Sequence, residues 1–139
     1  MFAADHRRRV FTGSLVGLTG SNGKTSTKEL LASALSQLGP TLATEGNFNN
    51  HLGVPLTLLR LRPQHRFAVV EMGMNHAGEI APLAAMAQPE VGIITNIGMA
   101  HIEFLGSQQA IAVEKGALAA AISASGTVVL PATEAFGKV

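Results

Sequence analysis

Residues 14–35 read SLVGLTGSNGKTSTKELLASAL, and they contain the clearest structural signal in the sequence. The apolar run at 15–19 predicts a short buried strand, and a glycine-rich turn closes it. Leucine and alanine then recur at helical spacing, which predicts a helix from about 25 to 38 that ends before Gly39-Pro40. Such a turn points backbone N–H groups at one place, and the start of the helix adds partial positive charge. The stretch therefore predicts a strand–loop–helix unit that binds phosphate.

The glycine loop departs from the usual phosphate-binding pattern, G-x-x-x-x-G-K-[ST]. Leu18 stands where that pattern has its first glycine, and Gly20 comes only three residues before Gly23. Lys24 nevertheless follows in the position that reaches the outer phosphates, and Thr25 offers a hydroxyl to Mg²⁺. A plain glycine turn that caps a helix is the alternative. A Gly-Lys-Thr triplet between strand and helix makes that alternative the weaker one.

The rest of the chain alternates between the two kinds of element. Continuous apolar runs predict strands at 67–71, 91–95 and 127–130, and helical spacing predicts helices at 54–61, 79–87 and 107–124. Because the strands lack polar alternation, they fit a parallel sheet that is buried on both faces by helices. The expected fold class is α/β, with residues 1–13 as a leading segment and a single domain from 14 to 139.

The amino-acid composition excludes several classes of protein. The 139 residues are 47% hydrophobic and 14% charged, with a net charge of +1 and no cysteine. The lack of cysteine excludes a disulfide framework and fits a reducing cytoplasm, where we expect the protein to act. No apolar run approaches the roughly 18–20 residues that a membrane span needs. The one basic cluster, Arg7 to Arg9, lies in the leading segment, so neither nucleic acid nor membrane is expected as a partner.

Two other strand ends carry side chains suited to a metal site. Ligands of open α/β sheets bind beyond the carboxyl ends of the strands. Glu71 ends one predicted strand, where its carboxylate either ligates Mg²⁺ or simply faces solvent. Asn96 follows the next strand, and His101 lies in the loop after it. Taken alone, a loop histidine is more often a surface residue than a ligand of Mg²⁺, which prefers oxygen.

Lys115 interrupts an otherwise apolar helical stripe. Ile111, Lys115, Leu118 and Ile122 fall at i, i+4, i+7 and i+11 of the last predicted helix. Spacing alone favours a lysine whose stem packs there while its ammonium reaches water. The other interpretation is a lysine directed at the phosphate or metal end of the sheet.

Several motifs together resemble the central ATPase domain of the Mur ligases. The shortened phosphate loop, TGSNGKTS at 19–26, is the form shared by Mur ligases and folylpolyglutamate synthases. GNFNNHLGVPLTLL at 46–59 and EMGMNHAGEI at 71–80 are similar to the branch that adds D-alanyl-D-alanine. NIGMAHIEFLGS at 96–107 and EKG at 114–116 complete the set. The resemblance implies the P-loop NTPase-like fold of that domain.

The resemblance also implies a role for each matching position. The residues that would hold the ATP phosphates are Gly20, Ser21, Asn22, Gly23, Lys24, Thr25 and Ser26. Those that would hold two Mg²⁺ ions are Thr25, Glu71, His101 and Lys115, the last as a carbamate. Those that would act in catalysis are Lys24, His101 and Lys115. Those that would lie near a UDP-muramoyl peptide are Asn47, Asn49, Asn50, Asn75 and His76. A carbamate would explain a lysine in an apolar stripe, because the modified side chain buries no positive charge.

The implied activity is ATP-dependent amide formation in the synthesis of peptidoglycan precursors. The carboxylate of UDP-N-acetylmuramoyl tripeptide would be phosphorylated by ATP, and D-alanyl-D-alanine would then displace phosphate. Members of this family also carry an N-terminal UDP-binding domain and a C-terminal ligase domain, which are absent from these 139 residues. We therefore expect an incomplete, truncated central domain with weak or no ligase activity by itself, from a parent protein that is monomeric.

Three other functions fit parts of the pattern. Another Mur ligase or a folylpolyglutamate synthase shares the short loop, although GNFNN at 46–50 argues against both. An ATP–Mg²⁺-binding module without catalysis would follow from truncation. A kinase or GTPase ranks last, because these enzymes usually keep the longer loop and no guanine-reading motif is present.

Overall fold

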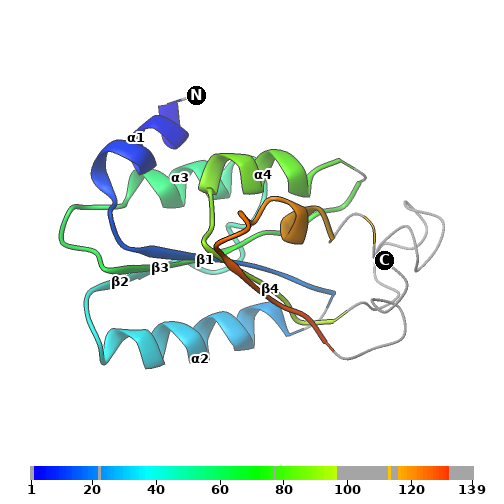
Figure 1. Cartoon of the computed structure of the whole chain (residues 1–139), viewed down its shortest axis with the longest axis horizontal. Coiled ribbons are helices and arrows are strands. Elements are labelled where there is room, and N and C mark those ends of the chain that lie inside the picture. The colour runs from blue at the N-terminus through cyan, green and yellow to red at the C-terminus, as the bar shows by residue number, and fades with distance from the viewer. Residues whose placement is uncertain (1, 22, 77, 97–112, 114–115, 132–139) are drawn as a thin grey trace.

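The computed structural model describes residues 2–21, 23–76, 78–96, 113 and 116–131. The labelled helices are α1 (Phe2–Val10), α2 (Lys24–Ser36), α3 (Gly53–Leu59) and α4 (Ile80–Ala87). The strands are β1 (Ser14–Thr19), β2 (Thr41–Ala43), β3 (Phe67–Glu71), β4 (Val91–Ile94) and β5 (Thr127–Val129). They form one parallel sheet in the order β2-β3-β1-β4-β5, with helices on both faces (Figure 1). The predicted α/β class is confirmed.

β1 lies at the centre of the sheet. It pairs with β3 on one side, where Val16 is opposite Val69, and with β4 on the other. Leu15 and Leu18 are fully buried, so the continuous apolar run of β1 serves both faces of the sheet. The phosphate loop therefore leaves β1 beside the carboxyl ends of both neighbouring strands.

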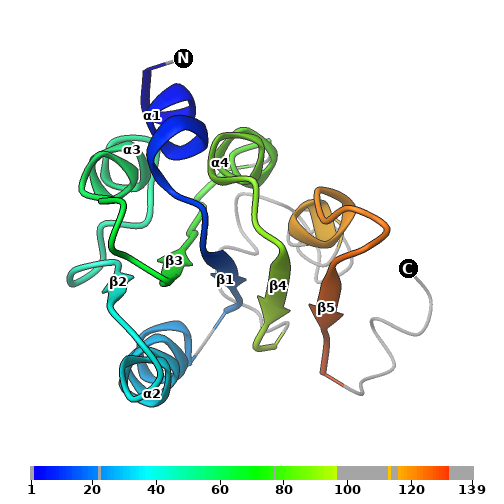
Figure 2. The same cartoon turned by 60° about the vertical axis from the view of Figure 1, so that its left-hand side comes forward.

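Helices cover the two faces of the sheet unequally. α1, α3 and α4 lie on one face, together with the helical residues 116–120, and α2 lies on the other (Figure 2). The apolar spacing of the predicted helix 25–38 indicates a buried stripe, yet Leu30 of α2 is 74% exposed, and Leu38, which lies beyond the end of α2, is 65% exposed. The residue of α2 that is buried is Lys28. No helix in the described part of the chain has both the length and the apolar surface that crossing a bilayer requires.

α1 is not indicated by the sequence pattern, which treats 1–13 as a leading segment. The helix packs on α3 and α4 and buries Ala3, Ala4 and Arg7. Two small residues and an arginine give a weak apolar period. The position of α1 is therefore decided by its tertiary partners, which a local pattern does not contain.

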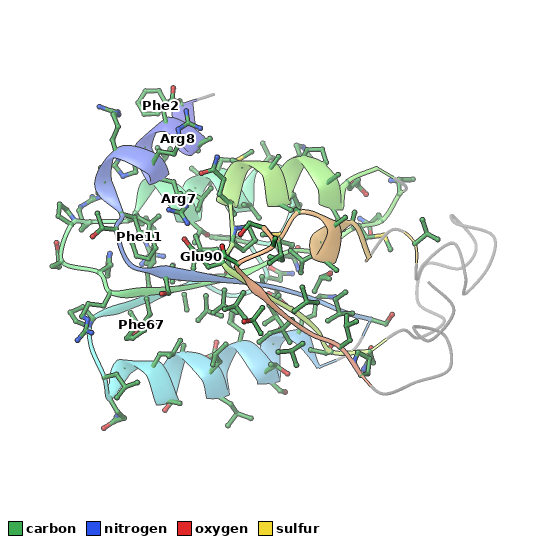
Figure 3. The ribbon with its side chains drawn as sticks, viewed as in Figure 1. Phe2, Arg7, Arg8, Phe11, Phe67 and Glu90 are labelled. Carbon is green, nitrogen blue, oxygen red and sulfur yellow. The ribbon has the colours of Figure 1, made fainter. Side chains whose placement is uncertain are left out.

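Arg7 joins α1 to the start of β4 (Figure 3). Its Nε donates to the carbonyl of Ala87 at 2.8 Å, and its Nη2 donates to the carbonyl of Gln88 at 2.8 Å. The same Nη2 donates to Glu90 Oε1 at 3.0 Å. The other carboxylate oxygen of Glu90 accepts from the N–H of Leu15 at 2.7 Å. One buried guanidinium therefore connects α1, the end of α4 and, through Glu90, the central strand.

Two further differences concern the bounds of elements. β2, at Thr41–Ala43, falls where no strand is predicted, because three residues are too few to show a period. The last helical segment ends at Ala120, before the predicted end at 124. Leu118 of the predicted stripe is fully buried, whereas Lys115 lies outside the described residues.

Candidate functional site

The loop between β1 and α2 depends on two glycines. Gly20 has φ +153°, and a Cβ on this residue would lie 1.8 Å from Oγ1 of Thr95. Gly23 has φ +82° and directly precedes α2. A side chain at Gly20 would collide with Thr95, and one at Gly23 would hold the backbone in a strained region. These two positions therefore require glycine in the short loop.

α2 begins at Lys24, and no side chain of the described residues caps it. The first N–H groups of a helix have no partner within the helix, so those of Lys24, Thr25 and Ser26 are directed at the same point as the helix dipole. The Nζ of Lys24 donates to the carbonyl oxygen of Gly20 at 2.8 Å. Burial lowers the pKa of Lys24, and the negative charge of Glu71 offsets part of that shift. The loop thus presents an ammonium and several N–H groups to an anion.

The end of β4 supports this loop from the other side. The N–H of Ser21 donates to Oδ1 of Asn96 at 3.0 Å, and the N–H of Thr95 donates to the carbonyl of Thr19 at 2.9 Å. The amide of Ser21, which the family resemblance assigns to phosphate, is therefore engaged inside the protein. Asn96 lies at the expected strand end, and its observed contact shapes the loop.

Glu71 and Thr25 meet beside Lys24. Glu71 ends β3 and is only 1% exposed. Its Oε1 lies 3.5 Å from Oγ1 of Thr25, and its Oε2 has no hydrogen-bond partner among the described residues. A buried carboxylate oxygen without a partner is costly, and a cation beside it would satisfy it. One carboxylate and one hydroxyl suit Mg²⁺, which commonly completes its shell with phosphate oxygens and water.

A pocket of about 550 Å³ opens next to Lys24. Its polar lining comes from Asn47, Asn49, Asn50, Asn75 and Glu79, and its apolar lining from Phe48, Leu52, Leu56 and Met74. The structure thus brings four of the five residues expected near the peptide substrate together with Lys24, although they come from two separate loops. The fifth, His76, is not among the lining residues, and its exposed ring lies 3.7 Å from Glu79 Oε1.

Two charged residues of this region are not among the site residues expected from the sequence. Glu79 Oε1 accepts from the N–H of His76 and, at 2.7 Å, from the N–H of Asn75. These hydrogen bonds lower the pKa of Glu79, so its carboxylate is ionised at neutral pH. In the sequence this residue lies within the motif EMGMNHAGEI but has no expected role beyond that of an acidic residue at the start of a helix. The second residue, Lys28, is fully buried and donates to the carbonyl of Gly46, although its neighbours along α2 give no hint of burial.

Three of the expected site residues, Asn22, His101 and Lys115, lie outside the described residues. Within the described ranges, no three His, Cys, Asp or Glu side chains gather into a group that would hold a metal ion. The second metal site and the carbamate on Lys115 therefore stay predictions.

The chain is similar in sequence and in structure to known proteins. A family profile, Mur ligase middle domain, matches residues 18–139. A UDP-N-acetylmuramoyl-tripeptide–D-alanyl-D-alanine ligase from Synechocystis sp. is 56% identical over 113 residues, which are 81% of this chain and 25% of the relative. The crystal structure of MurF from Acinetobacter baumannii superposes with a TM-score of 0.91 at 44% identity, over 94% of this chain and 29% of that one. The MurF ligase from Thermotoga maritima in complex with ADP gives a TM-score of 0.89 at 32% identity, over 98% and 32% of the two chains.

The matched range of the profile contains the phosphate loop, both pocket loops and the last strand. The chain spans about a quarter of the length of the curated relatives it matches. The profile includes the described residues from 18 onward, whereas α1 and the first part of β1 lie before it. The chain therefore belongs to the Mur ligase family, with residues 18–139 as its middle domain.

Proposed function

We propose that this chain is the ATP-binding core of a ligase that joins D-alanyl-D-alanine to UDP-N-acetylmuramoyl tripeptide, with ATP converted to ADP and phosphate. One observation carries the proposal: Lys24, Thr25 and Glu71 meet beside a pocket of about 550 Å³ that asparagines line. Two features of the relatives support it. The Synechocystis relative bears the name of this ligase, and the Thermotoga maritima structure holds ADP.

The reaction needs ATP because a carboxylate is a poor acyl donor. A carboxylate oxygen of the tripeptide attacks the γ-phosphorus, and the bond from that phosphorus to the β–γ bridging oxygen breaks. ADP leaves, and the peptide carries an acyl phosphate. The amine of D-alanyl-D-alanine then attacks the acyl carbon, the carbon–oxygen bond to phosphate breaks, and the amine loses its extra proton. The products are the amide, ADP and phosphate.

Different residues of the site would bind the phosphates, the metal ion and the peptide. The ammonium of Lys24 and the first N–H groups of α2 would lie against the phosphates, offsetting the repulsion between ATP and an anionic peptide. Thr25 and Glu71 would hold Mg²⁺, which supplies Lewis-acid polarisation of the transferred phosphoryl group. Asn47 and Asn49, with the other pocket asparagines, offer amide donors and acceptors that would orient the peptide carboxylate toward Lys24.

We also propose a second Mg²⁺ site that uses His101 and a carbamate on Lys115. The family resemblance supports this assignment, and both residues lie outside the part of the chain that the structure describes. Bicarbonate labelled with carbon-13 should give a carbamate resonance in the protein. The Lys115→Arg variant should lack that resonance, and an identical spectrum would argue against the modification.

The proposed activity is tested by ADP release from the complete polypeptide that the gene encodes. ADP should appear only when UDP-N-acetylmuramoyl tripeptide and D-alanyl-D-alanine are both present. Other amino acids in place of the dipeptide, or a folate in place of the muramoyl peptide, should give no turnover. Release with a folate would instead favour a folylpolyglutamate synthase. The 139-residue chain assayed alone should bind ATP–Mg²⁺ with weak or no turnover.

The Lys24→Met variant should bind ATP–Mg²⁺ roughly tenfold more weakly, because a charge-assisted contact to phosphate is lost. Since the pKa of Lys24 is lowered, wild-type binding should also weaken with rising pH before an ordinary lysine titrates. The Lys24→Arg variant should bind without that alkaline loss, because arginine stays protonated. Calorimetric titration with ATP–Mg²⁺ from neutral to alkaline pH measures both effects. Identical pH profiles for the wild type and Lys24→Arg would contradict the assignment.

A further inference from the structure

Lys28 is a fully buried lysine in the middle of a helix whose other residues are exposed or half-buried. Its Nζ donates to the carbonyl oxygen of Gly46 at 2.9 Å and lies 3.2 Å from Glu29 Oε1. The Glu29 side chain is 69% exposed, so its charge is largely screened by water. Burying an ammonium is costly unless its donors are used. The bond to Gly46 is therefore the specific interaction that this buried charge makes.

The position of Lys28 on α2 relates it to the phosphate loop. Lys24 and Lys28 are one helical turn apart, so they lie on the same face of α2. The first donates to the carbonyl of Gly20, within the phosphate loop. The second donates to Gly46, at the start of the loop that lines the pocket. A single helix face thus holds one backbone carbonyl from each of the two loops.

Three hydrogen bonds attach the pocket loop, residues 44–50, to α2 and to the segment 71–73, in addition to its contacts with Val69, Arg60 and residues 52–54. The N–H of Glu71 donates to Oγ1 of Thr44 at 2.9 Å, and the N–H of Gly73 donates to the carbonyl of Asn49 at 2.7 Å. Both of these contacts come from β3 and the residue pair after it. The third comes from Lys28, and it meets the loop between the other two. Lys28 is thus the connection between this loop and the helix that carries the phosphate site.

The carbonyl that Lys28 holds belongs to a special backbone position. Gly46 has φ +54°, a left-handed conformation that turns the chain just before Asn47. Nothing lies within 4 Å of a Cβ built on Gly46, so the glycine is required by the backbone angle and not by crowding. The next residues along the loop, Asn47 and Asn49, line the pocket.

We propose that Lys28 is a positioning residue that holds the 44–50 loop in register with the phosphate loop, so that the acceptor peptide binds facing Lys24. The proposal rests on the proposed function for the identity of that peptide. Lys28 contacts neither ATP nor metal in this role. Its loss should therefore weaken binding of the muramoyl peptide and leave binding of ATP nearly unchanged.

The test compares Lys28→Met with Glu29→Gln in the complete polypeptide. Methionine keeps an unbranched stem but donates no hydrogen bond. In Lys28→Met, the KM for UDP-N-acetylmuramoyl tripeptide should rise roughly tenfold, while the KM for ATP changes by less than about threefold. Glu29→Gln, which alters only the exposed partner of Lys28, should match the wild type. Lys28→Arg should recover part of the loss, because it restores a charged donor.

A merely structural role gives a different pattern. Partial unfolding would lower kcat through the fraction of active molecules and leave both KM values unchanged. Equal rises in the two KM values would also overturn the proposal. If Lys28→Met does not fold, Gly46→Ala perturbs the other end of the same hydrogen bond in an exposed loop. That variant should show the same selective rise in the KM for the peptide.

Hydrogen exchange separates failure of this proposal from failure of the proposed function. Lys28→Met should exchange the amides of residues 44–50 at least about tenfold faster than the wild type, with β1 and β4 unchanged. This measurement needs no substrate. Absence of ligase turnover in the wild type would contradict the proposed function but not the role of Lys28. Unchanged exchange at 44–50 would sink the role of Lys28, whatever the substrate is.

Discussion

Replacing Glu71 by glutamine should reduce ATP turnover at least about a hundredfold, because a neutral amide holds Mg²⁺ poorly and the metal is asked to stabilise developing charge. Stability should not fall with activity. Glu71 is only 1% exposed, and its Oε2 has no hydrogen-bond partner among the described residues. Removing the charge removes the cost of burying it, which offsets the lost attraction to the nearby ammonium of Lys24. We therefore expect the free energy of unfolding in urea, measured without metal, to stay the same or rise.

A matched control for this prediction is Glu45→Gln. Glu45 belongs to the pocket loop but is not among the residues that line the pocket, and its side chain is 65% exposed and pairs with Arg60 at 2.9 Å. Exposed ion pairs contribute little, so turnover and stability should both stay near the wild-type values. If Glu71→Gln loses stability as well as activity, the carboxylate is a structural group. Normal turnover in Glu71→Gln would remove it from the metal site.

Replacing Arg7 by alanine should lower the free energy of unfolding by about 4 kcal/mol, since a buried guanidinium and its partners are separated. The change leaves the carbonyls of Ala87 and Gln88 without their donor. It also removes the side chain that lies 5.3 Å from the ring centroid of Phe11. Urea unfolding followed by circular dichroism measures the difference.

Arg8→Ala is the matched control, one residue away in the same helix. Arg8 pairs with Asp5 at the surface, and both side chains are about half exposed. Its loss should change stability by less than about 0.5 kcal/mol. Similar effects of the two changes would mean that the hydrogen bonds of Arg7 add no specific stabilisation between α1 and the rest of the protein. A large loss confined to Arg7→Ala would show that α1 is part of the cooperative core.

The part of the fold that follows from local pattern is predictable from the sequence. β3 has its predicted bounds at 67–71, and β1 and α2 lie within one or two residues of theirs. In each, an apolar run or a glycine supplies the signal. α1 and β2 escape prediction for a physical reason. α1 is held by packing on α3 and α4 and by an arginine that reaches residues 80 or more positions away, and β2 is three residues long.

Some residues of the site are likewise predictable from the sequence, and others are not. The sequence places Lys24 and Thr25 on one loop and Glu71 on a strand end, and parallel strands bring such ends together. The family resemblance names four asparagines near the peptide, and the structure gathers all four around one pocket. Lys28 could not be found this way, because its burial depends on a carbonyl 18 residues further on. The roles of His101 and Lys115 stay predictions.

The bond between Ser21 and Asn96 has a consequence for the order in which the protein is made. It joins residues 75 positions apart, and Gly20 fits against Thr95 beside it. When only β1, α2 and β3 have left the ribosome, the phosphate loop is present but still lacks its contacts with Thr95 and Asn96. Pairings of such long separation form late, since the chain between them must first be closed into a loop. The nascent chain thus acquires its nucleotide site only after β4 and Asn96 have emerged.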